Sequence, residues 1–131
     1  MREQIVNFRS YDGCNLEGTL VRAENESAAL LFVHGITSSR DELGFHSDFA
    51  AFLGRSGVSS LRFDFRFHGK YESSLEDLTL CGIINDIDAA YEALCSHVIP
   101  ATKRFFLVAT SFGAGLSAYW ASQASVPQLK K

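Results

Sequence analysis

Apolar and polar residues alternate in short blocks, which predict first a pair of strands and then strands and helices in turn. Residues 5–8 and 16–21 flank an Asp-Gly turn and predict a β-hairpin. Residues 28–33 form a continuous apolar run, as expected of a strand that is buried on both faces of a sheet. Two further strands are predicted at residues 58–65 and 105–109.

Three segments carry apolar residues at helical spacing. From about residue 41 to 56 phenylalanines recur at this spacing, and Gly57 follows where a C-cap glycine belongs. A second helix has its apolar face between Ile84 and Val98. Residues 112–122 are almost wholly apolar and predict a helix that is covered on most sides. The alternation predicts an α/β fold, with a mostly parallel sheet after an N-terminal β-hairpin.

The composition is that of a soluble globular protein. The 131 residues suffice for one domain, 47% of them are hydrophobic, and 21% are charged. The net charge of −3 comes without a basic cluster, so nucleic acid is not expected as a partner. The longest apolar run is too short to span a bilayer and no signal peptide is visible, which favours a cytoplasmic location.

Cysteines and most charged residues add no catalytic candidate. Cys14, Cys81 and Cys95 are odd in number and lack C-x-x-C spacing, so neither a disulfide framework nor a zinc site is predicted. Asp64 and His68 end the second central strand, where buried or turn-stabilising roles are commoner than catalytic ones. One group of charged residues is interpreted as a solvated loop: Arg62, Arg66, Lys70, Glu72, Glu76 and Asp77.

The strongest chemical signal lies where the last predicted strand meets the last helix. Ser111 stands among small residues and matches the nucleophile-elbow pattern G-x-S-x-G, with Ala109 in place of the first glycine. Small residues are needed there because the serine sits on a tight, strained turn. The N-terminus of the helix leaves the N–H of Phe112 free to bind an oxyanion. The alternative is a small-residue turn whose serine only caps the helix.

His34 and Gly35 follow the first central strand and are predicted to form a turn. Nothing nearby completes a set of metal ligands with His34, and His46 is not at a ligand-pair spacing from it. In this position the loop can present the N–H of Ile36 as a second oxyanion donor.

Three sequence blocks resemble the successive landmarks of the α/β-hydrolase fold. They are LFVHGITSSRD, LRFDFRFHG and LVATSFGAG, which begin at Leu31, Leu61 and Leu107. Their spacing looks most like that of cinnamoyl (feruloyl) esterases and related lysophospholipase- or serine-aminopeptidase-like hydrolases. The resemblance covers nearly the whole chain, from the hairpin to the last helix.

The resemblance implies a serine hydrolase that acts on a small-molecule carboxylic ester. Ser111 would be the nucleophile that forms an acyl-enzyme, and Ile36 and Phe112 would donate backbone N–H groups to the oxyanion. No cofactor and no metal are implied. The supporting residues of this site would be His34, Gly35 and Gly113.

The chain also departs from the family pattern. Ala109 and Thr110 replace the usual glycine and histidine before the serine, and Phe67 replaces a glycine in the middle block. In this fold the residues of the catalytic triad follow one another along the chain in the order serine, acid, histidine. No Asp, Glu or His follows Ser111 in this sequence. Residues 1–131 are therefore expected to form a partial α/β-hydrolase domain, the N-terminal half, truncated after the nucleophile-elbow helix and without the later strands, the lid, the acid and the base.

Two other functions remain open. Residues 113–118 fit the dinucleotide fingerprint G-x-G-x-x-A, although that fingerprint normally opens a domain and here a hairpin, two strands and two helices precede it. The chain could also be an inactive hydrolase relative with a binding role, because the acid and the base are missing.

The last predicted strand is expected to have an exposed edge. Its sequence, FFLVA at residues 105–109, contains no charge or proline that would protect it. Beside it an apolar surface is expected from Leu107, Tyr119 and Trp120. Self-association, or docking of a missing C-terminal half, is expected at this edge.

Overall fold

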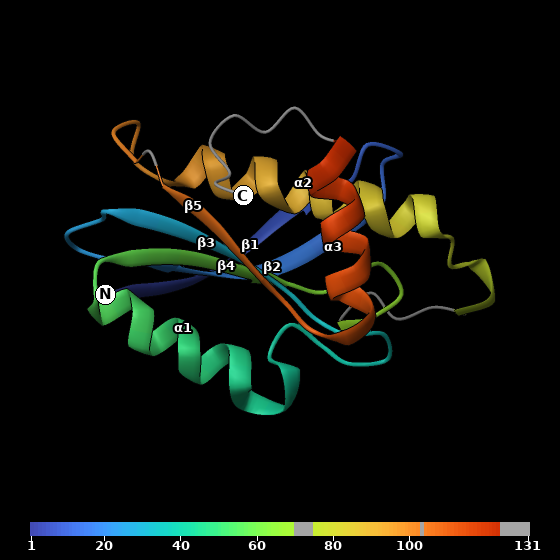
Figure 1. The fold of residues 1–131 in the computed structure, drawn as a ribbon, viewed down its shortest axis with the longest axis horizontal. Coiled ribbons are helices and arrows are strands. Elements are labelled where there is room, and N and C mark those ends of the chain that lie inside the picture. Colours follow the sequence, from blue (N-terminus) through green and yellow to red (C-terminus); the bar gives the residue numbers. More distant parts are fainter. Residues whose placement is uncertain (70–74, 103, 124–131) are drawn as a thin grey trace.

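The computed structural model describes residues 1–69, 75–102 and 104–123, and its centre is a mixed sheet flanked by helices (Figure 1). The strands follow the order β1-β2-β4-β3-β5 across the sheet. The elements are β1 (Arg2–Arg9), β2 (Asn15–Arg22), β3 (Ala28–Val33), the 3₁₀ turn η1 (Glu42–Gly44), α1 (Phe45–Arg55), β4 (Val58–Phe63), the 3₁₀ turn η3 (Leu75–Asp77), α2 (Leu80–His97), β5 (Phe105–Ala109) and α3 (Ser111–Gln123).

The pairing of the strands is that of a hairpin joined to a parallel sheet. β1 and β2 pair antiparallel along their whole length, from Arg2 opposite Arg22 to Arg9 opposite Asn15. β2 pairs antiparallel with β4, whereas β4, β3 and β5 run parallel to one another. The α/β fold with an N-terminal β-hairpin and a mostly parallel sheet is thus confirmed.

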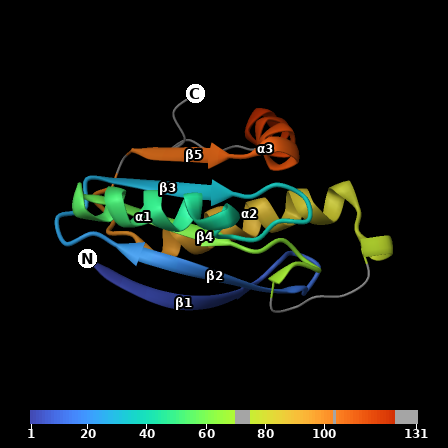
Figure 2. The same ribbon diagram turned by 90° about the horizontal axis from the view of Figure 1, so that it is seen from below.

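The helices cover both faces of the sheet, which explains why β3 is apolar throughout. α1 lies on one face, and α2 and α3 lie on the other (Figures 1 and 2). Leu30 and Phe32 pack with α1, while the alternate residues Leu31 and Val33 belong to the larger core with α2. All residues of β3 are buried, so the predicted burial on both faces is confirmed.

The predicted covering of the last helix on most sides is wrong. The buried residues of α3 are Gly113, Ser117 and Trp120, and Tyr119 is 55% exposed. The apolar character of this helix comes largely from glycine and alanine. Their side chains are so small that exposing them to water costs little free energy. Trp120, expected on the exposed surface, is instead 2% exposed, and its indole N–H donates to Asp88 of α2.

Arg62 and Arg66 are also not part of a solvated loop, because carboxylates from distant elements surround both. Arg62 contacts Asp41 at 2.8 Å and Glu3 at 3.5 Å. Arg66 is 8% exposed, although it begins a mostly polar segment of the sequence. Glu76 and Asp77 are exposed as expected, and the predictions for Lys70 and Glu72 fall outside the described residues.

Arg66 ties the hairpin to α2. Its guanidinium lies 2.7 Å from Asp86 of α2 and 2.6 Å from Asp12 of the β1–β2 turn, and it also donates to the Ser10 hydroxyl. Burial alone would lower the pKa of Arg66, but the bonds to Asp86 and Asp12 outweigh it and raise that pKa above its usual range. Asp86 is fully buried and depends on this one cation for compensation.

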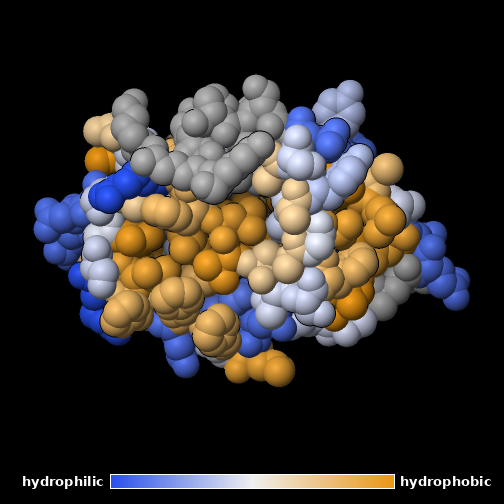
Figure 3. All heavy atoms as spheres, in the orientation of Figure 1, coloured by the Kyte–Doolittle hydropathy of each residue, from blue (hydrophilic) through white to orange (hydrophobic). Residues whose placement is uncertain are grey.

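Apolar side chains also gather on the surface of the α1 face. Figure 3 shows them beside α1 and along β5, and Phe45, Phe52 and Phe106 are 60%, 58% and 43% exposed.

None of the helices in the described part of the chain is long and apolar enough to cross a membrane.

We expect Arg66→Ala to lower the free energy of unfolding by about 3–5 kcal/mol, because it leaves the Asp86 carboxylate buried without its partner. Urea unfolding followed by circular dichroism measures the change. Arg9→Ala removes an exposed arginine of β1 and should cost less than about 0.5 kcal/mol. Equal losses in the two variants would contradict this role of Arg66.

Candidate active site

Ser111 lies at the turn between β5 and α3, where the sequence predicted it. The N–H of Thr110 donates to the carbonyl of Val33 at 3.0 Å and thus continues the pairing of β5 with β3. The next residue, Ser111, has a φ of 51° and begins α3 with its side chain exposed. A left-handed serine is strained by about 1 kcal/mol, and such strain is common at functional sites. The turn therefore presents the hydroxyl at the carboxyl end of the parallel strands.

Gly113 and Gly35 allow the elbow and the β3–α1 loop to touch. A Cβ on Gly113 would lie 2.2 Å from the carbonyl oxygen of His34, a distance that no side chain can adopt. A Cβ on Gly35 would lie 3.5 Å from the Cβ of Ser111, in ordinary contact. The structure thus brings Ser111, Gly35 and Gly113 together as predicted.

The two predicted oxyanion donors flank this contact. Ile36 follows Gly35 in the loop, and its N–H makes no hydrogen bond within residues 1–69, 75–102 and 104–123. Phe112 is the second residue of α3, where backbone N–H groups have no intrahelical acceptor. The positive end of the helix dipole favours negative charge at the same place. Among the described residues neither of these two N–H groups has a backbone acceptor outside a helix or strand.

His34 serves as a link between two strand ends. It is fully buried, its Nδ1 lies 2.6 Å from the oxygen of Gly35, and the N–H of Phe65 donates to its Nε2. The ring is thus neutral, with its proton on Nδ1. Burial lowers the pKa of His34, which favours this neutral form. Since both ring nitrogens are engaged, the turn-forming interpretation fits the structure and a free base does not.

Asp64 and His68 hold the β3–α1 loop from the end of β4. Asp64 accepts the N–H of Arg40 at 2.7 Å, and its other oxygen lies 3.2 Å from the guanidinium of Arg40. His68 accepts the N–H of Thr37 at 3.0 Å, and its second ring nitrogen faces the carbonyl of Arg66. These contacts support the turn-stabilising roles.

Two departures from the family pattern have visible structural consequences. Phe67, which replaces a glycine, has a φ of 62°, a backbone conformation that favours glycine. Thr110, which replaces a histidine, places its hydroxyl 3.0 Å from Nε2 of the buried His46 on α1. Burial lowers the pKa of His46, which favours the neutral ring. Since Nδ1 faces the carbonyl of Arg40, Nε2 of a neutral ring accepts from the Thr110 hydroxyl.

Sequence reasoning missed Glu42. Its carboxylate accepts the N–H of Gly35 at 2.8 Å and the hydroxyl of Ser38 at 3.1 Å. The pattern of phenylalanines placed it inside the first helix, but α1 begins at Phe45, after the left-handed residues Glu42 and Leu43. Gly44, which interrupts the helical pattern, was the one signal that could have shown this.

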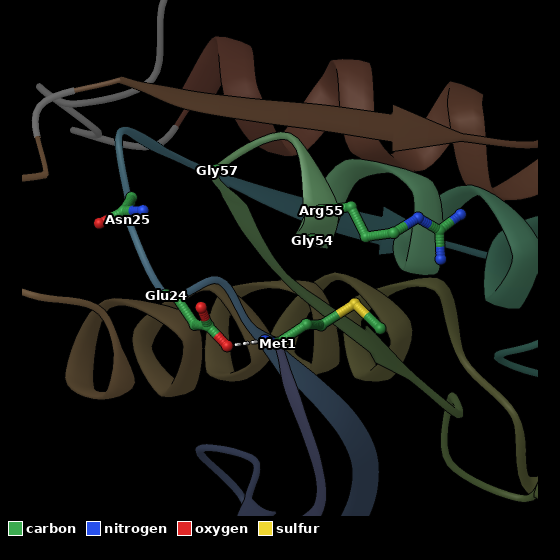
Figure 4. Close-up of a pocket in the computed structure, with 6 residues that line it drawn as sticks. All are labelled: Met1, Glu24, Asn25, Gly54, Arg55 and Gly57. Atoms are coloured by element: carbon green, nitrogen blue, oxygen red, sulfur yellow. Dashed lines mark hydrogen bonds and ion pairs between the residues drawn. The ribbon is translucent and has the colours of Figure 1, made fainter.

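A hollow of about 300 Å³ lies at the opposite end of the sheet. Its lining, shown in Figure 4, is Met1, Glu24, Asn25, Gly54, Arg55 and Gly57. These residues lie near the amino ends of β3 and β4, whereas ligands of open α/β sheets bind at the carboxyl ends of the strands. In the described ranges no group of three or more His, Cys, Asp or Glu side chains could hold a metal ion.

No family model matches the sequence, and comparison with curated proteins gives no match. Solved structures do match. The α/β-hydrolase GrgF from Penicillium sp. sh18 has a TM-score of 0.82 at 21% identity, over 95% of this chain and 43% of its own. The esterase Pf2001 of Pyrococcus furiosus has a TM-score of 0.79 at 26% identity, over 95% and 48%. Est1E of Butyrivibrio proteoclasticus, solved with ferulic acid, has a TM-score of 0.73 at 23% identity, over 88% and 46%.

The fold is therefore that of an α/β-hydrolase, and the resemblance to this superfamily is confirmed. The chain spans less than half the length of each of these structures.

We expect Gly113→Ala to destabilise the protein by about 1–3 kcal/mol, because the added methyl group meets the carbonyl of His34. Gly115→Ala is the matched control on the same helix: a Cβ there meets nothing within 4 Å. It should stabilise α3 by about 0.5–1 kcal/mol. Thermal unfolding of both variants measures the difference. The same melting temperature in both would contradict the close contact.

Proposed function

We propose that this chain carries the nucleophile of a serine hydrolase that acts on a carboxylic ester. The observation that supports this most is the left-handed Ser111 at a strand–helix turn, in contact with the Gly35 loop. In the proposed reaction the Ser111 hydroxyl attacks the ester carbonyl, and the N–H groups of Ile36 and Phe112 stabilise the oxyanion. The alcohol leaves, and water then releases the acid from the acyl-enzyme.

The substrate class rests on the similar structures. Pf2001 is an esterase, and Est1E was solved with ferulic acid. These proteins share the fold and are about twice as long as this chain. By analogy with them, we propose for this chain a small-molecule ester with an apolar or aromatic part. Ile36, Leu43 and Phe45 offer exposed apolar surface in the loop beside Ser111 and at its end.

The general base of the reaction is proposed to come from outside the described residues. His34 and His68 each engage both ring nitrogens with the backbone. His46 is buried between Thr110 and the carbonyl of Arg40. His97 lies at the end of α2 and contacts the carbonyl of Ala93 on its own helix.

The two alternatives receive less support. In a dinucleotide fingerprint the first glycines form the turn between strand and helix, whereas Gly113 and Gly115 lie within α3, which already begins at Ser111. An inactive relative with a binding role would need no strained serine, yet Ser111 keeps its positive φ.

We expect the 131-residue chain to label slowly at Ser111 with a fluorophosphonate and to show negligible turnover of a chromogenic short-chain ester. An oxyanion hole without a base keeps only part of the catalytic power, on the order of 10³–10⁴-fold over water. Ser111→Ala should abolish the labelling, whereas Ser122→Ala, an exposed serine on the same helix, should not change it. Strong turnover that is lost in Ser111→Ala would show that an upstream histidine acts as the base.

We also propose that β5 pairs with a further strand, supplied by a second copy or by a C-terminal half of the hydrolase domain. Within the described residues β5 pairs with β3 alone, and Phe106 is 43% exposed beside it. The other edge strand, β1, carries Arg2, Glu3 and Arg9, which protect it, whereas β5 carries no charge.

We expect the isolated chain to self-associate through β5. Phe106→Lys should reduce the association by placing a charge on that edge, whereas Ile5→Lys on β1 should not, although Ile5 is 54% exposed. Light scattering over a range of protein concentrations measures the effect. A wild-type chain that remains monomeric at all concentrations would refute self-association at this edge.

A further inference from the structure

The loop between β3 and α1 is held by side chains at three backbone N–H groups. The N–H of Gly35 donates to Glu42, that of Thr37 to His68, and that of Arg40 to Asp64. His68 and Asp64 come from the chain after β4. Glu42 is the one acceptor of these three that belongs to the loop itself.

Glu42 closes this loop on itself. Its two oxygens accept one bond each, from the N–H of Gly35 at 2.8 Å and from the hydroxyl of Ser38 at 3.1 Å. The N–H of Ser38 in turn donates to the carbonyl of Gly35 at 3.2 Å. The start, middle and end of the loop are thereby joined through one carboxylate.

The backbone at Glu42 is strained to place this carboxylate. Glu42 has a φ of 44° and Leu43 a φ of 58°, and neither is a glycine. Consecutive left-handed residues of this kind cost about 1–2 kcal/mol each and persist only where the surroundings impose them. Leu43 is fully exposed, so packing of its side chain does not impose the conformation.

The carboxylate remains ionised. Burial alone would raise the pKa of Glu42, but the hydrogen bonds from Gly35 and Ser38 outweigh it and hold the pKa below its usual value. An ionised carboxylate accepts both bonds at once, which a protonated one does less well.

The carboxylate and the elbow both lie close to Gly35. From the position that a Cβ on Gly35 would take, the Glu42 oxygen is 3.9 Å away and the Ser111 Cβ is 3.5 Å away. The N–H of Ile36 is one peptide unit from the bond that Glu42 accepts. An oxyanion donor is effective only when it is fixed before the reaction.

We propose that Glu42 is a positioning residue, which fixes the His34–Gly35 peptide unit so that the next N–H along the loop, that of Ile36, faces the oxyanion. Glu42 does not touch the reacting atoms. This role rests on the proposed function of Ser111 and Ile36, and it adds the residue that orders the oxyanion loop.

The test is the rate of fluorophosphonate labelling of Ser111 in four variants. Glu42→Ala should label at least about tenfold more slowly, since loss of an oxyanion donor costs on the order of 10²–10³ and misplacement costs part of it. Glu42→Gln keeps one acceptor oxygen for the Gly35 N–H, and its amide N–H can donate to the Ser38 hydroxyl, so labelling should stay within about threefold of the wild type. Glu42→Asp keeps the charge but shortens the side chain, and should lose nearly as much as Glu42→Ala. Asp48→Ala removes an exposed carboxylate of α1 and should have no effect.

Hydrogen exchange of the loop separates this inference from the function on which it rests. The Gly35 amide should lose protection in Glu42→Ala and Glu42→Asp, and keep it in Glu42→Gln and Asp48→Ala. If wild-type Ser111 does not label at all, the proposed function fails and the exchange data still decide whether Glu42 orders the loop. Wild-type labelling together with full Gly35 protection in Glu42→Asp would overturn the role of Glu42, even if Glu42→Ala does not fold.

Discussion

The close approach of two backbones, at Gly113 and at the carbonyl of His34, is the constraint on which the site depends. It follows from the parallel pairing of β3 with β5, which brings Val33 opposite Ala109. Beyond that pair the two segments that follow β3 and β5 stay close together, and a Cβ on Gly113 would lie 2.2 Å from the His34 oxygen. The helix after the serine can start so close to β3 only because a glycine stands there. This contact sets the serine beside the loop that offers the Ile36 N–H.

The loop on the other side of this contact has little regular backbone bonding of its own. Part of its order comes from Glu42 within the loop, and part from bonds to the segment after β4. In these bonds the His34 ring accepts the Phe65 N–H, and His68 accepts the Thr37 N–H. These bonds are buried or partly buried, so each broken one leaves a polar group that water cannot easily satisfy. The segment after β4 therefore supports the site without reaching it, and this gives a structural reason for two histidines that resemble catalytic candidates.

The sequence predicted the sheet and the elbow well, because both depend on local patterns. β3 and β5 have the predicted bounds, whereas β4 ends at Phe63 because the N–H of Phe65 donates to His34 and not to a strand. The burial of Arg66 could not be predicted, since Asp12 and Asp86 lie far from it in the sequence. Glu42 was missed for a similar reason: its partners are a backbone N–H and a hydroxyl, which leave no pattern of residue types.

Backbone strain in the described residues is concentrated at one end of the sheet. The non-glycine residues with positive φ are Thr37, Glu42, Leu43, Phe67 and Ser111. They follow β3, β4 and β5, so all lie beyond the carboxyl ends of the parallel strands. Each costs roughly 1–3 kcal/mol, which buried bonds such as those of Glu42 and His68 must offset. A protein that needed only a stable turn at each strand end could use glycine or a relaxed loop. Strain of this kind at three successive strand ends fits the proposed site, whose hydroxyl and N–H groups would have to stay fixed relative to one another.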